Sequence, residues 1–510
     1  MILHPARRTT APIRPSRIAL FALILLACFV GSRVAAQDVP PSDSVTAIHQ
    51  DEPAAEGHAS AEQVQAVEHH ESPPFFLTLP FVVLLLMIAT GPLFYEHHWH
   101  HHYPKWAVGL GLVTAAYYYF ALHTTYPIMH AMTEYLSFIA LLAALFIASG
   151  GIVIRVNSKG TPPANSVLLF VGAVISNVIG TTGASMLLIQ PFMRLNQGRI
   201  KAYHIIFFIF VVSNVGGALT PIGDPPLFLG FLRGVPFFWT LAHVWYAWLP
   251  TVLVLIAIFY VFDMRNREEC TTELKKGVST VRVSGVKNFF WLAAVVVSVF
   301  IDPNVFGWVP ALYVGETHLP FGIREIIMFS ICFLAYRFAS QEALEANDFN
   351  FGPIKEVAWL FVGIFLTMQP ALELIRDFAN TNAETLTVSM FYWGTGALSG
   401  VLDNAPTYVS FLSAAMGKFG LDVNVVADVA NFSAPAVGAP EFLQAISIAA
   451  VFFGAMTYIG NGPNFMVKAI AEASGVDCPS FAGYLVRYSL PILVPTYFLV
   501  WVVMYSGWIF

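Results

Sequence analysis

The sequence predicts an all-α membrane protein with many spans, made of two inverted repeats that each contain a re-entrant hairpin and a broken helix. Hydrophobic residues make up 57% of the 510 residues and charged residues only 11%. Apolar runs of about 20 residues, the length that crosses the hydrocarbon core of a bilayer, recur from Phe75 to the C-terminus. Two of these runs are interrupted by helix breakers and polar side chains.

The N-terminal segment has the features of a secretory signal. Its positive region contains arginines and no acidic residue, and an apolar stretch and a small-residue cleavage site follow it: Arg7, Arg8, Arg14 and Arg17, then 18–30, then Val34, Ala35 and Ala36. We predict a signal peptide over 1–36, and a retained anchor helix is the alternative. Residues 37–73 are rich in Pro, Ser, His and acidic residues, which predicts a disordered exported tail. Residues 74–510 then form the transmembrane domain.

Ten segments have the length and composition of spans, and two further stretches have the length of hairpins. The spans are 75–94, 106–122, 135–154, 202–232, 239–262, 288–314, 321–337, 357–376, 441–475 and 484–508, and the hairpins are 164–195 and 386–416. With the tail outside, most Lys and Arg lie on the inner side, as the positive-inside rule requires; the predicted outer exceptions are Arg233, Arg324, Arg376 and Lys418. We therefore predict a multi-pass protein of a bacterial inner membrane.

The predicted elements occur twice in the same order, over about 135–262 and 357–508: span, hairpin, broken helix, span. An odd number of crossings separates the two hairpins, so the second copy is inverted relative to the first. Broken helices in corresponding positions of two halves are typical of secondary transporters, whose substrate sites lie at such breaks.

The breaks and the hairpin tips carry the polar residues. The breaks lie at 213–226 and 456–464, and the tips at 176–185 and 399–407. Irregular backbone survives at membrane depth only where it is buried in protein or lines a cavity. Hydroxyl, amide and carbonyl oxygens replace the hydration shell of a small hard cation. The four motifs therefore predict paired cation sites near the middle of the membrane.

Gly223-Asp224-Pro225-Pro226 and Asp403-Asn404-Ala405-Pro406-Thr407 resemble motifs of the ion transporter superfamily, and are most similar to its NhaD-type sodium/proton antiporters and to related citrate transporters. The resemblance covers about 135–508. It implies one cation site at Ser176, Asn177, Thr181, Gly217 and Thr220, and a second at Asn404, Thr407, Gly460 and Asn461. It also implies a homodimer.

Asp224 and Asp403 are the strongest candidates for ion exchange. An intramembrane acid is costly and by default functional, and a buried carboxylate can bind either a proton or Na+. Sodium-coupled carboxylate transporters have a neutral Ser-Asn-Thr tip where this chain has Asp403. The alternative for both acids is capping of a half-helix N-terminus, and capping and ion binding can coexist.

The first functional hypothesis is a sodium (or lithium)/proton antiporter, with Na+ and H+ as its partners and no cofactor. The alternative is a cation-coupled transporter of citrate or another carboxylate, and arsenite efflux is a third transport option. No zinc-protease motif and no nucleotide-binding loop of the Gly-x-x-x-x-Gly-Lys type occurs. The composition gives no indication of nucleic-acid binding.

Other polar residues have structural interpretations. His97, His98, His100, His101 and His102 follow the first span; we favour an interfacial loop over a pH sensor or a metal site. We expect solvated caps at span ends for Glu134, Arg376, Asp377 and Glu441, and a helix end at Asp302. Asn214 is expected to link helices, and Lys468 either neutralises the empty site or extends to the membrane surface.

Overall fold

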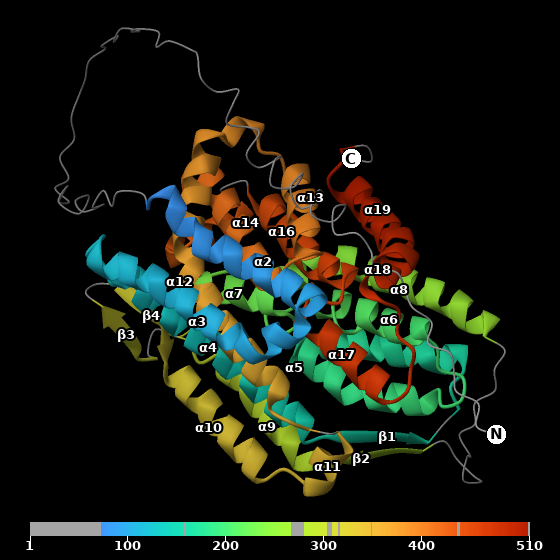
Figure 1. Ribbon diagram of the computed structural model, residues 1–510. Coiled ribbons are helices and arrows are strands. Elements are labelled where there is room, and N and C mark those ends of the chain that lie inside the picture. The colour runs from blue at the N-terminus through green and yellow to red at the C-terminus, as the bar shows by residue number, and fades with distance from the viewer. Residues whose placement is uncertain are drawn as a thin grey trace, which may run out of the picture. The chain divides into compact units, whose positions relative to one another are not determined.

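The computed structural model describes residues 73–157, 159–266, 280–302, 306, 309–314, 317–347, 349–435 and 439–507, and most of them are helical (Figure 1). Within these ranges, six helices are long and apolar enough to cross a membrane: Phe75–Pro92, Tyr126–Gly150, Pro162–Leu195, Trp239–Arg265, Gly352–Thr381 and Phe481–Met504. The predicted all-α multi-pass class is confirmed. The predicted signal peptide and all but the end of the predicted tail lie outside the described residues.

The chain enters the described part through η2 (Phe75–Thr78), α2 (Leu79–Phe94) and α3 (Glu96–Phe120). The prediction of an interfacial loop at the histidines was wrong, because α3 begins at Glu96 and includes them. Close packing holds α3 against α12 (Gly352–Thr381), since a Cβ on Gly363 would lie 2.5 Å from the carbonyl oxygen of Ala107.

The first repeat contains α4 (Tyr126–Gly150), α5 (Pro162–Leu195), α6 (Ala202–Val211), η3 (Val215–Gly217), α7 (Pro225–Arg233) and α8 (Trp239–Arg265). Within α5 the chain turns back at Gly180, whose φ of 78° suits glycine. Asn165 and Asn196 exchange two hydrogen bonds of 2.8 Å although 31 residues separate them. A straight helix would hold them about 46 Å apart at about 1.5 Å per residue, so α5 is the predicted hairpin.

The second repeat contains α12, η4 (Ala383–Thr385), α13 (Val388–Ser399), α14 (Asn404–Lys418), α15 (Val426–Ser433), α16 (Pro440–Phe453), η6 (Gly454–Met456), α17 (Gly462–Ala473), α18 (Phe481–Tyr484), η7 (Leu485–Leu493) and α19 (Val494–Met504). Here α13 and α14 form the predicted hairpin, and α16 and α17 are the halves of the broken helix. Both predicted breaks are present in the structure.

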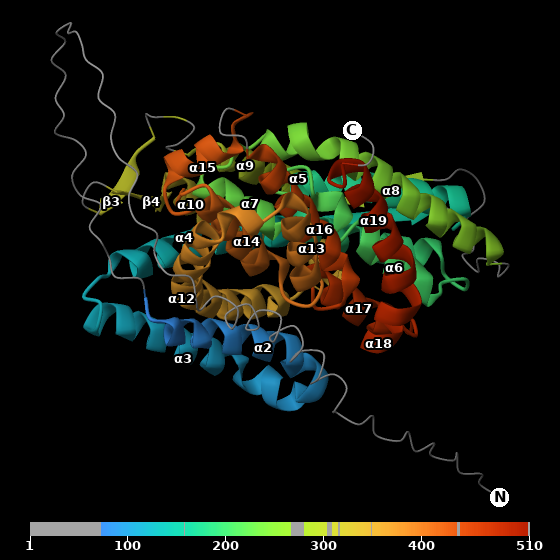
Figure 2. The ribbon, with the colours of Figure 1, turned by 90° about the horizontal axis from the view of Figure 1, so that it is seen from above.

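The two repeats interlock. The hairpin α5 packs against α17, the second half of the other repeat's broken helix, and α14 packs against α7 in the same way (Figures 1 and 2). Each hairpin is therefore in contact with the broken helix of the opposite repeat, which brings all four motifs to one place.

The connection between the repeats contains α9 (Val286–Val299), α10 (Ile323–Arg337) and α11 (Gln341–Ala346). Two short antiparallel strand pairs accompany them: β1 (Val153–Asn157) with β2 (Thr280–Ser284), and β3 (Ala311–Val314) with β4 (Thr317–Gly322). The predicted span 288–314 was too long, because α9 ends at Val299 and β3 starts at Ala311. Asp302 follows the helix and forms an ion pair with Arg324, which also contacts Glu325.

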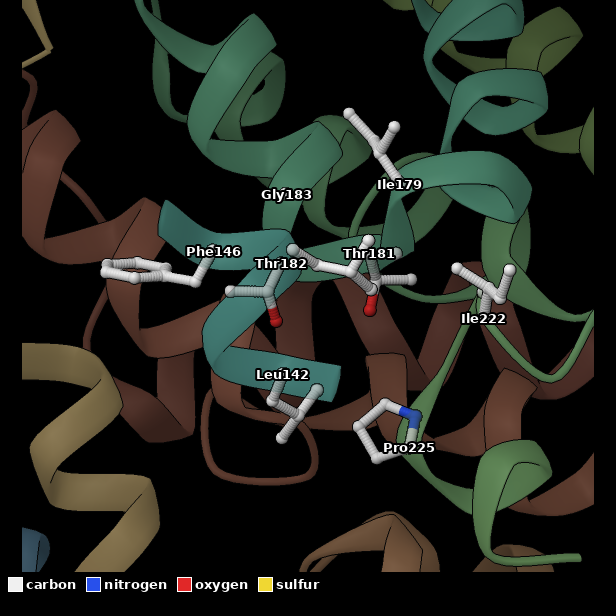
Figure 3. Close-up of a pocket in the computed structure, with 11 residues that line it drawn as sticks. Leu142, Phe146, Ile179, Thr181, Thr182, Gly183, Ile222 and Pro225 are labelled. Atoms are coloured by element: carbon white, nitrogen blue, oxygen red, sulfur yellow. The ribbon is translucent and has the colours of Figure 1, made fainter. Parts of the chain in front are cut away.

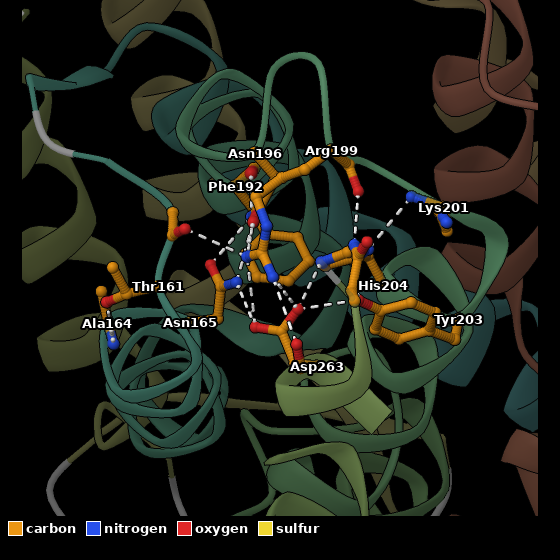
Figure 4. A network of polar contacts seen from close by, with 12 residues as sticks. Thr161, Ala164, Asn165, Phe192, Asn196, Arg199, Lys201, Tyr203, His204 and Asp263 are labelled. Atoms are coloured by element: carbon orange, nitrogen blue, oxygen red, sulfur yellow. Dashed lines mark hydrogen bonds and ion pairs between the residues drawn. The ribbon is translucent and has the colours of Figure 1, made fainter. Parts of the chain in front are cut away.

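A buried polar network ties the open end of the first hairpin to its neighbours (Figure 4). The Asp263 carboxylate at the end of α8 accepts hydrogen bonds of 2.7 Å from Arg199 and Tyr203 and of 2.8 Å from Asn165, and His204 lies 3.2 Å from it. Because Asn165 also bonds Asn196 at the other end of α5, one ion pair fixes both arms of the hairpin.

A second buried ion pair joins α4 to α7. Glu134 was predicted to be a solvated cap, and this was wrong: it is fully buried and lies 2.7 Å from Arg233, which also donates to Asn424. A carboxylate is stable there because Arg233 compensates its charge. Arg376, in contrast, is only partly buried and pairs with Asp422 and Asp377.

Candidate functional site

All four motifs meet at the side chain of Asp224. Its Oδ1 accepts hydrogen bonds from the Thr181 hydroxyl at 2.7 Å and the Asn461 amide at 2.9 Å, and its Oδ2 accepts one from the Asn404 amide at 2.6 Å. Thr181 comes from the first hairpin, Asn404 from the second, and Asn461 from the second broken helix. One carboxylate therefore joins the two repeats.

At the first break α6 ends at Val211, and after the short 3-10 helix η3 the α-helix resumes only at Pro225. Between them the Thr220 hydroxyl accepts from the backbone N–H of Gly223 at 3.1 Å, and the Gly223 carbonyl accepts from the N–H of Thr181 at 2.8 Å. Asp224 is extended, with φ −144° and ψ 144°, and prolines begin α7. The hairpin tip thus satisfies backbone groups that the break exposes.

The second break repeats this geometry. The Thr457 hydroxyl accepts from the N–H of Gly460 at 3.1 Å, and Asn461 has φ −154° and ψ 141°. Both breaks follow the pattern Thr-x-Ile-Gly-Asp/Asn-x-Pro, from Thr220 in one and Thr457 in the other. Asn461 therefore occupies the position that Asp224 occupies in the first repeat.

Glycine is required at both breaks because the backbone approaches itself. A Cβ on Gly223 would lie 2.1 Å from the carbonyl oxygen of Gly217, and one on Gly460 would lie 2.6 Å from that of Gly454. Real Cβ atoms do not approach so closely. Gly217 and Gly460, two of the predicted site residues, thus lie in these tight loops.

The other residues predicted for the first site build the break. The Ser176 hydroxyl donates to the carbonyl of Val212 at 2.8 Å, and Asn177 donates to that of Gly216 at 2.7 Å. Thr220 in turn donates to the carbonyl of Asn177 at 2.5 Å. These side chains join the hairpin to the irregular segment. Thr181, from the same hairpin, donates a hydrogen bond to Asp224.

Asp403 and Thr407 stabilise the start of α14. The Asp403 carboxylate accepts from the N–H of Ala405 at 2.9 Å, and the Thr407 hydroxyl donates to the carbonyl of Asp403 at 2.9 Å. Asp403 is partly buried and caps its own helix, as the capping alternative predicted. Asp224 is also an N-cap residue, but its side chain makes no capping hydrogen bond.

The electrostatic setting of Asp224 is unusual for a buried acid. Its exposed fraction is 1%, and no ion pair joins it to a Lys or Arg in the described part of the chain. The Oδ1 of Asn404 is buried without a hydrogen-bond partner. Lys468 does not reach the site, because it pairs with Glu472 at 2.9 Å. The three hydrogen bonds to the carboxylate therefore come from neutral donors, and the charged group that interacts with it electrostatically, Asp403, is another acid.

A small cavity lies on the α4 side of the site (Figure 3). It has room for about one water molecule and is lined mainly by apolar residues, with Thr181 and Thr182 supplying hydroxyl groups. The full lining is Leu142, Leu145, Phe146, Ile179, Gly180, Thr181, Thr182, Gly183, Ile222, Gly223 and Pro225. It borders the residues on either side of Asp224.

Sequence reasoning missed one contributor to the second break, Thr457. Thr457 corresponds to the predicted Thr220, and the shared Thr-x-Ile-Gly pattern was the signal that identifies it. Asn464 accepts from Asn214 at 2.7 Å and donates to the carbonyls of Gly454 and Thr457, so it closes the second break. Nothing in its spacing distinguishes that role from a ligand.

Paired hairpins and broken helices that meet at a buried carboxylate define a multi-pass membrane transporter. The comparisons with known proteins agree with this class. A family model described as "Putative citrate transport" matches residues 70–505, and the chain belongs to this family. The search of curated proteins found no match. The match supports the resemblance to ion and citrate transporters, and it does not distinguish the NhaD-type branch.

Proposed function

We propose that the protein is a secondary active antiporter that exchanges Na+, or Li+, for protons, and that Asp224 is the carboxylate on which they exchange. The observation that carries this proposal is the position of Asp224, which is buried, lacks a basic partner among the described residues and accepts hydrogen bonds from the other three motifs.

A buried carboxylate without a cation is unstable, because removing its charge from water is costly. Either a proton or a small cation neutralises it, and both cannot occupy it fully at once. Binding of Na+ to the carboxyl group therefore releases its proton, and the returning proton releases Na+. Exchange on one carboxyl group follows from this competition.

Oxygen ligands for the cation lie close by. Small hard cations prefer carboxylate, hydroxyl and amide oxygens. The Thr181 hydroxyl bonds the carboxylate directly, and the unpaired Oδ1 of Asn404 belongs to a side chain that already contacts it. Because these groups come from both hairpins, occupancy by an ion affects both repeats together, as alternating access requires.

Cation-coupled transport of citrate or another carboxylate is the second candidate, and the family match favours it. The N-termini of α7 and α17 both point helix dipoles toward the break region, and this favours an anion. Against it, a charged Asp224 repels a carboxylate substrate and no described Lys or Arg pairs with Asp224 to offset that repulsion. The neutral donor set supports cation exchange better.

The test uses full-length protein in liposomes with a trapped pH dye, challenged separately with Na+, Li+, K+ and citrate. Antiport predicts proton movement on addition of Na+ or Li+ and none with Asp224→Asn. Glu441→Gln is the matched control, since Glu441 is an exposed acid at the start of α16, and it should behave as the wild type. Uptake of radiolabelled citrate without any cation-driven proton movement would overturn the proposal in favour of the second candidate.

A further inference from the structure

The histidines at the start of α3 form two pairs that the transport site does not use. His97 and His101 are four residues apart, as are His98 and His102, and side chains at this spacing are neighbours on one face of a helix. The ring centroids lie 4.7 Å apart in the first pair and 4.4 Å apart in the second. Each pair has the spacing of a two-histidine chelate.

A backbone contact orients one ring of each pair, that of His101 in the first and that of His102 in the second. Nδ1 of His101 lies 2.9 Å from the carbonyl oxygen of His97, and Nδ1 of His102 lies 3.0 Å from that of His98. A carbonyl oxygen only accepts, so Nδ1 carries the proton and Nε2 keeps its lone pair in the neutral ring. Metal-binding histidines are typically held in this way, with one ring nitrogen bonded to a carbonyl and the other left for the metal.

The surroundings distinguish the two pairs. His97, His98 and His101 are exposed. The Nε2 of His98 is approached by the indole N–H of Trp106 at 3.4 Å, so a metal there must displace this contact. His100 lies outside both pairs and interacts electrostatically with Glu356 of α12.

We propose that His97 and His101 bind one divalent transition-metal ion through their Nε2 atoms, and that His98 and His102 form a second, weaker site. Imidazole ligands suit Zn²⁺, Ni²⁺ and Cu²⁺. Among the residues that the structure describes, no cluster of three or more His, Cys, Asp or Glu is arranged to hold a metal, so water completes the coordination of each ion. A bound ion links the first two turns of α3, the helix that packs along α12.

The proposal is tested by calorimetric titration of Zn²⁺ and of Ni²⁺ into the detergent-solubilised full-length protein, purified without a histidine tag. A background variant with His49, His58, His69 and His70 changed to Gln removes the histidines of the exported tail from the signal. In that background, His97→Gln/His101→Gln should weaken the tighter site at least about tenfold, the scale expected when metal coordination is disturbed. His98→Gln/His102→Gln should remove only the weaker site.

Two further variants make the result specific. His100→Gln should leave both sites unchanged, and Trp106→Phe should strengthen the weaker site by freeing Nε2 of His98. Gln is a good helix former, so circular dichroism and the elution profile should match the background protein. An unchanged tight site in folded His97→Gln/His101→Gln protein would overturn the proposal, as would equal losses with His100→Gln. Because binding is measured without transport, this result is independent of the proposed antiport.

Discussion

The two helix breaks have nearly the same backbone and differ by one charge. At Asp224 and Asn461 the φ angles are −144° and −154° and the ψ angles 144° and 141°, and a threonine hydroxyl closes each preceding turn at 3.1 Å. The first repeat presents a carboxylate at this position and the second an amide. The shared backbone shows that the breaks are equivalent as structures, and the difference in side chain assigns the charge to the first.

This difference is what makes one site out of two halves. The amide nitrogen of Asn461 lies 2.9 Å from Oδ1 of Asp224 and donates a hydrogen bond to it. A carboxylate in place of this amide would repel the charged Asp224. Asn461 also donates to Asn214 at 3.2 Å, and Asn214 donates to Asn464. The second break therefore supports the acid of the first.

The largest effect is expected when the charge is removed or moved. Asp224→Asn should abolish Na+-dependent proton movement, because an amide cannot exchange a proton for a cation. The swap Asp224→Asn/Asn461→Asp returns one carboxylate to the same hydrogen bond from the equivalent backbone position, and should restore measurable exchange. Dye-loaded liposomes measure both.

The single variant Asn461→Asp is the control for the swap, because it adds an acid without removing one. Exchange that is lost in Asp224→Asn and stays lost in a folded swap protein would show that the two breaks are not interchangeable. Full exchange in Asp224→Asn alone would show that the charge at the first break is not needed for exchange.

Adding a methyl group to the tight loops should damage the first break more than the second. Gly223→Ala places Cβ 2.1 Å from a carbonyl oxygen and Gly460→Ala places it 2.6 Å away. Backbone has to move in both cases, and overpacking costs about 3 kcal/mol at the upper end of its usual range. We expect the larger drop in thermal unfolding midpoint for Gly223→Ala. Gly462→Ala, with no atom within 4 Å of its added Cβ, is the control.

Removal of the Thr181 hydroxyl should have a smaller effect, and this effect should fall on Na+ and proton binding. Thr181→Ala removes a 2.7 Å hydrogen bond to the carboxylate, and bonds to charged groups contribute about 2 kcal/mol. The charged acid loses this support, so the proton competes better, and half-saturation should require about thirtyfold more Na+ or a higher pH. Thr181→Ser keeps the hydroxyl and should stay near the wild type. Equal half-saturation in all three proteins would place Thr181 outside the cation's surroundings.

The architecture was predictable because a bilayer requires long apolar segments, and interruptions of those segments are visible in the sequence. Clusters of prolines, glycines and polar residues within an apolar span indicate irregular backbone, so the hairpins 164–195 and 386–416 and both breaks were recognisable. The meeting of Thr181, Asn404 and Asn461 at Asp224 was not, because it depends on each hairpin packing against the other repeat. Two sites were predicted, and the structure brings three of the candidates, Thr181, Asn404 and Asn461, together at one carboxylate.

Burial explains the remaining differences from prediction. Glu134 lies beside the start of the predicted span 135–154, where solvent was expected, but α4 begins at Tyr126 and Arg233 reaches Glu134 from α7, 99 residues later in the chain. The histidines after Tyr95 were predicted to form a loop, but α3 begins at Glu96 and includes them, and α3 packs along α12. Long-range partners of this kind leave no local pattern in the sequence.

Asp403 provides the smallest predicted effect and the most direct challenge to the contrast between the halves. Its carboxylate caps α14 through the N–H of Ala405 at 2.9 Å, and Asn caps as well as Asp. Asp403→Asn should therefore leave the unfolding midpoint and Na+/H+ exchange close to the wild type, whereas Asp403→Ala should lose about 1 kcal/mol of stability.

One exchanging carboxyl group also predicts that one Na+ replaces one proton, so a membrane potential should not drive the exchange. If Asp403→Asn stops exchange as Asp224→Asn does, or if a potential drives proton movement, both repeats carry an exchanging acid, and the charge difference at the breaks does not decide the mechanism.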